Sequence, residues 1–304
     1  MRKPNPSIAI AGSSGFLGQA LAKALTLHGA EVKRLIRSQP SQGTSKEVYW
    51  NPSSGHIERV GLEGVDIVIN LAGAPIADKR WTPRQKELLI QSRIQSTELL
   101  SKTLAKLKTP PKLFLSASAV GYYGTDDHKV FDESSPHGDD FLASLCVAWE
   151  EATRQAQEKG IQTIHLRSAP VLGTEGGVLK GMLPFFKTGL GAYIASGNQP
   201  ISWISLADWI AAVEFLIFKS PTTGPVNLTS PNPVTNREFS ETLAKVLKRP
   251  CKLNMPESLI VWRYGEMAKT MLVEGAKVQP KKLLEMGFEF EYPTLQKALA
   301  AILT

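Results

Sequence analysis

The chain has 304 residues, of which 42% are hydrophobic and 21% charged, and it has two cysteines, Cys146 and Cys251. This length is enough for two lobes with a substantial core, and no apolar run reaches the roughly 18 to 20 residues that a membrane span needs. The net charge of +7 favours anionic ligands, with a solvated basic surface as the alternative. The charges are scattered and no recognition motif is present, so nucleic acid is not expected as a partner, and the lack of a long apolar run predicts no membrane partner. The cysteines lack metal-ligand spacing, so no metal site is expected, and they predict a reduced, cytoplasmic protein.

The first thirty residues predict a strand, a glycine-rich turn and a helix. Residues 8–11 form an apolar run typical of a buried strand, and residues 19–28 have the pattern of an amphipathic helix. Glycine permits the angles of a tight strand-to-helix turn and lacks the Cβ that would block a pyrophosphate, which the N–H groups of the helix start would face. A purely structural turn is the alternative. The predicted diphosphate-binding residues are Gly12, Ser13, Ser14, Gly15, Phe16, Leu17 and Gly18, with a G-x-x-G-x-x-G spacing.

The second strand predicts the type of cofactor by the residues that follow it. An Asp or Glu there would accept hydrogen bonds from the adenosine ribose and favour NAD, but this chain has Arg37 and Ser38. A guanidinium binds a 2′-phosphate bidentately, and a serine adds a hydroxyl donor. We therefore expect NADP(H), with the capping of an exposed strand end as the alternative role of Arg37.

Strands and helices go on alternating to about residue 170. Strands are expected at 31–36, 65–71, 113–116 and 162–166, and helices at 82–107 and 141–158. Repeated β-α-β units predict an α/β fold with a doubly wound parallel sheet. Beyond Gly173, glycines punctuate short segments. We predict a dinucleotide-binding domain over 1–173, completed by a strand near 226–230, and a smaller, interleaved α/β substrate lobe over 174–304 with a distinct unit at 250–300.

The third strand ends in Leu71, Ala72 and Gly73, at the carboxyl edge where ligands bind in such sheets. Gly73 would let the chain pass close to the adenine and ribose, so these three residues are predicted cofactor contacts. Ser92, on the long helix that follows, is a further candidate, although a solvated helix face explains it equally well.

Several segments together resemble the extended short-chain dehydrogenase/reductases. Besides the glycine turn, they are Asn70-Leu71-Ala72-Gly73, Leu115-Ser116-Ala117-Ser118-Ala119-Val120-Gly121-Tyr122-Tyr123-Gly124 and Leu166-Arg167-Ser168. Nearly the whole chain is similar to the atypical, epimerase-like subfamily of the NAD-dependent epimerase/dehydratase superfamily, which carries a C-terminal domain of unknown function. The resemblance implies a Rossmann-type fold, cofactor contacts that include Ser116, Ala117 and Arg167, and a homodimer through the helices at 82–107 and 141–158.

The usual catalytic pair of these enzymes is missing here. Typical members carry Tyr-x-x-x-Lys, a spacing that places both side chains on one helical face so that the lysine lowers the pKa of the tyrosine. Leu142 and Cys146 occupy these positions, and neither can do this chemistry. Ser118 matches the partner hydroxyl of the pair, with Ser116 as the alternative. Tyr122 or Tyr123, on the following loop, is the candidate general acid, with ordinary loop packing as the alternative.

Two functions are therefore open. The preferred one is an NADP(H)-binding oxidoreductase, epimerase- or reductase-like, that acts on an unidentified small carbonyl or sugar-like substrate, for which the basic charge makes an anion a candidate. The alternative is a non-catalytic NADP(H)-binding redox sensor or interaction protein that kept the fold and lost the proton-transfer pair.

Overall fold

A computed structural model of the chain describes residues 5–39, 45–219 and 222–303. An eight-stranded sheet forms its centre, and all neighbouring strands run parallel except the last two. The prediction of a Rossmann-type, doubly wound parallel sheet is confirmed. From one edge to the other, the strands are β13 (Gly224–Leu228), β8 (Gln162–Ser168), β6 (Leu113–Ala119), β5 (Ile67–Asn70), β1 (Ser7–Ala11), β2 (Glu31–Ile36), β3 (Glu47–Asn51) and β4 (His56–Ile57).

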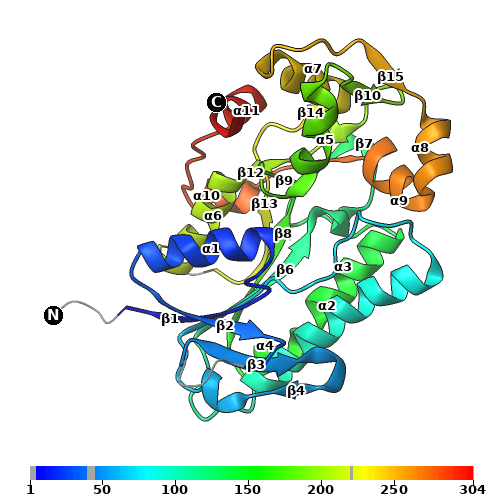
Figure 1. Cartoon of the computed structure of the whole chain (residues 1–304). Helices are drawn as coiled ribbons and strands as arrows, with labels where there is room; N and C mark the ends of the chain where they lie inside the picture. Colours follow the sequence, from blue (N-terminus) through cyan, green and yellow to red (C-terminus); the bar gives the residue numbers. More distant parts are fainter. Residues whose placement is uncertain (1–4, 40–44, 220–221, 304) are drawn as a thin grey trace.

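Helices cover both faces of the sheet because its strands are apolar on both sides. In β1, Ile8 and Ile10 face one layer, and Ala9 and Ala11 face the other. The first layer contains α1 (Phe16–Leu27) and α6 (Leu206–Phe218). The second contains α2 (Pro83–Leu104), α3 (Phe141–Glu151) and α4 (Arg154–Glu158) (Figure 1).

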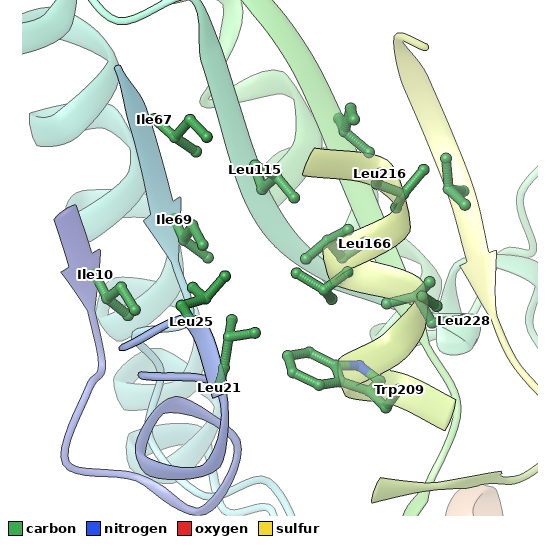
Figure 2. Close-up of a cluster of buried hydrophobic side chains, with 14 of the residues drawn as sticks. Ile10, Leu21, Leu25, Ile67, Ile69, Leu115, Leu166, Trp209, Leu216 and Leu228 are labelled. Atoms are coloured by element: carbon green, nitrogen blue, oxygen red, sulfur yellow. The ribbon is translucent and has the colours of Figure 1, made fainter. Parts of the chain in front are cut away.

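The first layer holds the larger core. Trp209 and Leu216 of α6, together with Leu21 and Leu25 of α1, point at aliphatic side chains of the sheet (Figure 2). Each such fully buried aliphatic side chain stabilises the fold by about 1.5–3 kcal/mol. The sheet residues labelled in Figure 2 are Ile10, Ile67, Ile69, Leu115, Leu166 and Leu228.

Capping side chains set the starts of the helices in the second layer. Thr82 accepts a hydrogen bond from the N–H of Gln85 at the start of α2, and Pro83 occupies the first helical position. Asp140 caps α3 in the same way. The helix predicted over 141–158 is divided into α3 and α4, because the Thr153 hydroxyl bonds to the Glu150 carbonyl and to His165, which competes with helical hydrogen bonding.

The residues after β9 (Val171–Leu172) build a second hydrophobic cluster, in which Trp203 and Phe239 are buried. The chain then returns to the large sheet through α6 and β13. We call the residues around the second cluster the second lobe. The remaining strands are β7 (Asp126–Phe131), β9 (Val171–Leu172), β10 (Ala192–Ile194), β11 (Pro200–Ile201), β12 (Ile204–Ser205), β14 (Val234–Thr235), β15 (Leu253–Met255) and β16 (Ala276–Val278). The remaining helices are α5 (Gly177–Lys187), α7 (Asn236–Val246), α8 (Glu257–Tyr264), α9 (Glu266–Ala268), α10 (Lys281–Glu285) and α11 (Leu295–Leu303).

Four short turns complete the secondary structure. They are the 3₁₀ turns η1 (Pro52–Ser54), η2 (Arg59–Leu62) and η3 (Val120–Tyr123), and one π-helical turn, η4 (Lys269–Val273). Over the described ranges, no helix combines the length and apolar character that crossing a bilayer requires. The same residues contain no cluster of three or more His, Cys, Asp or Glu side chains that could hold a metal ion.

Candidate functional site

The glycine turn joins β1 to α1, and two of its glycines have no room for a side chain. Gly12 has a φ of 78°, and a Cβ there would lie 2.7 Å from the Leu71 carbonyl carbon. A Cβ on Gly18 would lie 2.2 Å from the Gly12 oxygen. These two residues therefore let the turn pack against α1 and against the loop that follows β5.

Gly15 differs from the other two glycines. A Cβ on it would meet only the Gly12 oxygen, at the ordinary contact distance of 3.4 Å, so packing within the protein does not demand a glycine. Gly15 is exposed and is the N-cap of α1, where no side chain caps the helix and the first turn carries no acidic residue. The N–H groups of a first helical turn have no partner in their own helix and attract anions. The turn thus offers open backbone donors with no Cβ in front of them, which fits a diphosphate.

Other residues of the turn have different surroundings. Ser13 is buried, Ser14 is exposed, and Leu17 packs partly into the main core. The ring of Phe16 lies under the 173–177 loop, where a Cβ on Gly173 or Gly176 would be 2.6 or 2.5 Å from that ring. Phe16 therefore connects the turn to the second lobe by direct packing.

Arg37 and Ser38 lie at the same edge of the sheet as the turn. Ala11 pairs with Leu35 in the parallel β1–β2 ladder, so Arg37 extends beyond β2 beside the residues that extend beyond β1. Both Arg37 and Ser38 are exposed. Within the described ranges, Arg37 has no hydrogen-bond or ion-pair partner, which leaves its guanidinium free for a ligand phosphate.

Side chains of β5 and α2 hold the loop that contains Leu71, Ala72 and Gly73. The buried Asn70 donates to the Thr97 hydroxyl at 2.8 Å and accepts from the Ala72 N–H at 3.2 Å. The Ser92 hydroxyl accepts from the Ala74 N–H at 3.1 Å. Ser92 therefore positions this loop, and its contact with the cofactor stays a prediction.

Ser118 lies in a buried hydrogen-bond network whose centre is Glu150. The Ser118 hydroxyl donates to Glu150 Oε1 at 2.7 Å. Arg167 donates to both Glu150 oxygens, from Nε at 2.8 Å and from Nη2 at 2.9 Å. Burial alone would lower the pKa of Arg167, but the hydrogen bonds to Glu150 raise it above its usual value. Arg167 is only 3% exposed, so its side chain holds Glu150 inside the protein.

Tyr123 belongs to the same network, whereas Tyr122 lies beside it. The Tyr123 hydroxyl donates to Asn227 at 2.7 Å and accepts from Arg167 at 3.0 Å. Burial raises the pKa of Tyr123 to about 12. Tyr122 is half-buried, with its ring centroid 3.4 Å from Arg167 Cζ, and its hydroxyl has no hydrogen-bond partner in the described part of the chain. Of the two tyrosines, Tyr122 has the available hydroxyl.

Leu142 and Cys146 lie on the face of α3 that packs against the end of β6 and the η3 turn. A Cβ on Gly121 would be 3.2 Å from Leu142 Cβ, and Cys146 Sγ is 3.8 Å from the Ala119 oxygen. Burial raises the pKa of the Cys146 thiol to about 12. Both residues therefore act as core packing.

Ser116 and Ala117, also predicted cofactor contacts, lie on opposite faces of β6. Ala117 is half-buried, whereas Ser116 is fully buried and its hydroxyl has no partner among the residues that the structure describes. Glu150 is the residue that the sequence reasoning missed. Its partners Ser118 and Arg167 lie 32 and 17 residues away from it, so no local spacing marks it in the sequence.

Comparisons with known proteins agree with this architecture. The profile of the NAD dependent epimerase/dehydratase family matches residues 8–228, and a domain of unknown function (DUF1731) matches residues 255–302. The epimerase family protein MT2273 of Mycobacterium tuberculosis is 43% identical over 97% of both chains. A crystal structure of human epimerase family protein SDR39U1 (isoform 2) with NADPH is 32% identical, with a TM-score of 0.89 over 97% of this chain and 98% of that one. A nucleoside-diphosphate sugar epimerase from Corynebacterium glutamicum is 30% identical, with a TM-score of 0.79 over 98% of this chain and 58% of that one.

Proposed function

This chain belongs to the NAD dependent epimerase/dehydratase family, and we propose that it binds NADPH for epimerase- or reductase-type chemistry on a small carbonyl or sugar-like substrate. The observation that carries this proposal is the turn at Gly15, where no side chain caps the first turn of α1 and packing within the protein does not demand a glycine. The similar human protein SDR39U1, crystallised with NADPH, supports the same cofactor here. The two free cysteines suit a reduced compartment, so we place the protein in the cytoplasm.

Three groups of residues would hold the cofactor. The turn of residues 12–18 would bind the diphosphate, and Arg37 with Ser38 would bind the 2′-phosphate. The loop formed by Leu71, Ala72 and Gly73 would lie along the adenosine side, because Gly12 packs directly on Leu71. When bound, the nicotinamide ring supplies or accepts a hydride.

The proton must come from this chain without a Tyr-x-x-x-Lys pair. We assign it to Tyr122, whose hydroxyl is available, rather than to Tyr123, whose hydroxyl is engaged with Arg167 and Asn227. The guanidinium of Arg167 lies over the Tyr122 ring, with its Cζ 3.4 Å from the ring centroid, and would hold that ring in place. Ser118 donates its hydroxyl proton to Glu150, so it would accept a hydrogen bond from the hydroxyl form of the substrate.

A non-catalytic NADPH-binding sensor is the second candidate. The observation that favours it is the engagement of the Ser118 and Tyr123 hydroxyls within the protein, next to the apolar Leu142 and Cys146. In such a protein the network would maintain the shape of the site and transfer no proton.

Two measurements test these proposals. Titrating the purified protein with NADPH and NADH, followed by fluorescence, should show tighter binding of NADPH. Equal or tighter binding of NADH would contradict the assignment. Incubating 4-deuterated NADPH with a library of carbonyl compounds should transfer deuterium stereospecifically to one product if the protein is an enzyme. Inertness towards the library, with a partner protein recovered only in the presence of NADPH, would support the sensor.

A further inference from the structure

Arg93 is a buried cation that has no counter-ion among the residues that the structure describes. It lies on α2, is 9% exposed, and packs 5.1 Å from the centroid of the Trp149 ring. Its two hydrogen bonds go to main-chain carbonyls, from Nη1 to Leu89 at 3.2 Å and from Nη2 to Ala74 at 3.0 Å. No carboxylate in the described residues forms an ion pair or hydrogen bond with it. A guanidinium has five N–H donors, so most of its hydrogen-bonding capacity is unused.

Arg167 shows how this fold treats another buried arginine. It is buried to a similar degree, but both oxygens of Glu150 neutralise it. A buried charge is costly unless a partner compensates it. For Arg93, burial lowers the pKa to about 10, the direction opposite to that of Arg167. The charge of Arg93 is therefore buried without a carboxylate partner, whereas Arg167 has Glu150.

The position of Arg93 suggests a role for this buried charge. A Cβ built on Gly73 would lie 3.4 Å from Arg93 Cζ, and Gly73 is itself exposed. The guanidinium thus lies directly beneath the surface of the loop after β5. On one side, this loop touches the glycine turn through Leu71. On the other, Ala74 and Ile76 join an apolar cluster with residues of α3 and α9, in the direction of the second lobe.

We propose that Arg93 is the counter-charge for an anionic group, a carboxylate or a phosphoryl group, of a ligand that binds against Gly73 and Ala74. The absence of a Cβ at Gly73 lets such a group approach the guanidinium closely. This inference rests on the proposed NADPH site and extends it, because the anion is either a phosphate of the cofactor or the acidic group of the substrate. In the second case the protein acts on acids, and neutral carbonyl compounds are poor substrates.

The test compares the wild-type protein with Arg93→Met, in two arms at constant ionic strength. The first arm measures the Kd of NADPH by fluorescence titration. The second saturates the protein with NADPH and measures the rise in Tm produced by inorganic phosphate and by acetate, with acetamide as the neutral control. Loss of a charge-assisted contact predicts an affinity roughly 10- to 100-fold weaker. Weakening in the first arm identifies a cofactor phosphate as the anion, and loss of the Tm rise in the second identifies an acidic substrate group.

Lys86→Met is the matched control, because it removes one positive charge from the same helix but from a residue that Glu266 already neutralises. Lys86→Met should change neither the Kd of NADPH nor the rise in Tm with phosphate and acetate. If Arg93→Met matches the wild type in both arms while the wild type binds NADPH, the inference is wrong and the proposed function survives. If the wild type binds no NADPH, the proposed function itself fails.

Arg93→Lys and a crystal structure keep the test decisive if Arg93→Met does not fold. The lysine variant keeps the charge and should recover part of the lost binding. Wild-type crystals grown with NADPH and phosphate should show an anionic oxygen beside Gly73, within reach of the guanidinium. Only water at this place, in crystals that contain NADPH, would overturn the inference.

Discussion

Arg37 is exposed and has no partner in the part of the chain that the structure describes, beside the start of α1. An arginine in this position costs the protein no desolvation, and its full charge is available to a ligand. Arg34, three residues earlier on β2, is also exposed but lies within the strand, in register with Ile10 of β1. The two side chains have the same chemistry and differ in where they lie relative to the edge of the sheet.

The first prediction uses this difference. Arg37→Gln should raise the Kd of NADPH roughly 10- to 100-fold, because a charge-assisted contact with the 2′-phosphate is lost. NADH, which lacks this phosphate, should bind as before. Arg34→Gln is the control and should change neither affinity in fluorescence titrations. An unchanged NADPH affinity in Arg37→Gln would assign the 2′-phosphate to another residue.

Gly15 and Gly18 give the second prediction, since alanine has opposite consequences at the two positions. Gly18→Ala should lower stability by about 1–3 kcal/mol, because its Cβ would overlap the Gly12 oxygen. Gly15→Ala should leave the Tm of the free protein within about 1–2 °C of the wild type and weaken NADPH binding, because its Cβ would enter the space for the diphosphate. Thermal unfolding without and with NADPH measures both effects. If Gly15→Ala binds NADPH as tightly as the wild type, the diphosphate does not bind at this turn.

The third prediction separates the two tyrosines. Tyr123→Phe should destabilise the protein by about 1–3 kcal/mol, because it leaves Asn227 and one Arg167 donor unsatisfied in a buried place. Tyr122→Phe should keep the stability and reduce turnover of any reduced carbonyl compound by about 10²- to 10⁴-fold. Urea unfolding and steady-state rates give the two readouts. Full activity in Tyr122→Phe would exclude it as the proton donor.

Residues with local roles were predictable from the sequence, and residues with distant partners were not. The turn of residues 12–18 and the cap at Thr82 follow from spacings of a few residues. The environments of Ser118 and Arg167 depend on Glu150, which belongs to another element. Sequence reasoning placed Arg167 at the cofactor without weighing this partner. Tertiary pairing of this kind leaves no periodic pattern in a single sequence.

Among the elements, β7 and β16 form the join between the site and the C-terminal segment. They pair in parallel, and the N–H of Gln279 donates to the Phe131 carbonyl. In the corner that follows β7, Asp132 pairs with Lys281 at 3.1 Å, and Glu133 accepts hydrogen bonds from the N–H groups of Asn227 and Lys282. Two adjacent carboxylates thus fix β13 and α10 to the end of β7.

The fourth prediction concerns pH and this corner. The Ser134 hydroxyl, with Lys281 in support, lowers the pKa of Asp132 to about 2 from an ordinary value near 3.8. A depressed carboxyl pKa contributes stability that is present above the unfolded pKa and is lost as the pH falls through the folded one. The wild type should therefore lose more stability than Asp132→Asn between pH 4 and pH 2, as measured by urea midpoints. Parallel losses in both proteins would show that this carboxylate does not contribute.

The order of strands and helices was predictable in outline from the sequence, since their alternation indicates a parallel sheet. Its finer divisions depended on packing. The break between α3 and α4 arises because Thr153 bonds to His165 of β8, and no helix-stop residue marks it. The expected homodimer through α2 and α3 stays a prediction, which the half-exposed Leu88 of α2 supports.

Over the whole molecule, the C-terminal segment contacts the sheet domain at several places, of which three stand out. Leu283 and Phe288 enter the main core, β16 pairs with β7, and Glu266 pairs with Lys86 of α2. Its final helix, α11, fills the second cluster with Leu295 and Leu299. Apolar residues from this segment therefore complete both cores.

The fifth prediction follows from these shared cores. Calorimetry should show one cooperative unfolding transition, with equal calorimetric and van't Hoff enthalpies, rather than one transition for each lobe. NADPH should move this single transition upward, by an amount that grows with the logarithm of its concentration. Two resolved transitions, with only one sensitive to NADPH, would show that the lobes unfold separately.

Phe16 gives the nucleotide turn a mechanical connection to the other lobe. Its ring fills the space under Gly173 and Gly176. Phe16 is also the first residue of α1, and the N-terminus of α1 would bind the diphosphate. A ligand that immobilises the first turn of α1 would also restrain the 173–177 loop, which leads into α5. Binding of NADPH at the glycine turn should therefore slow amide hydrogen exchange near residues 173–183. The second lobe would then become more rigid when the cofactor binds, before the substrate does.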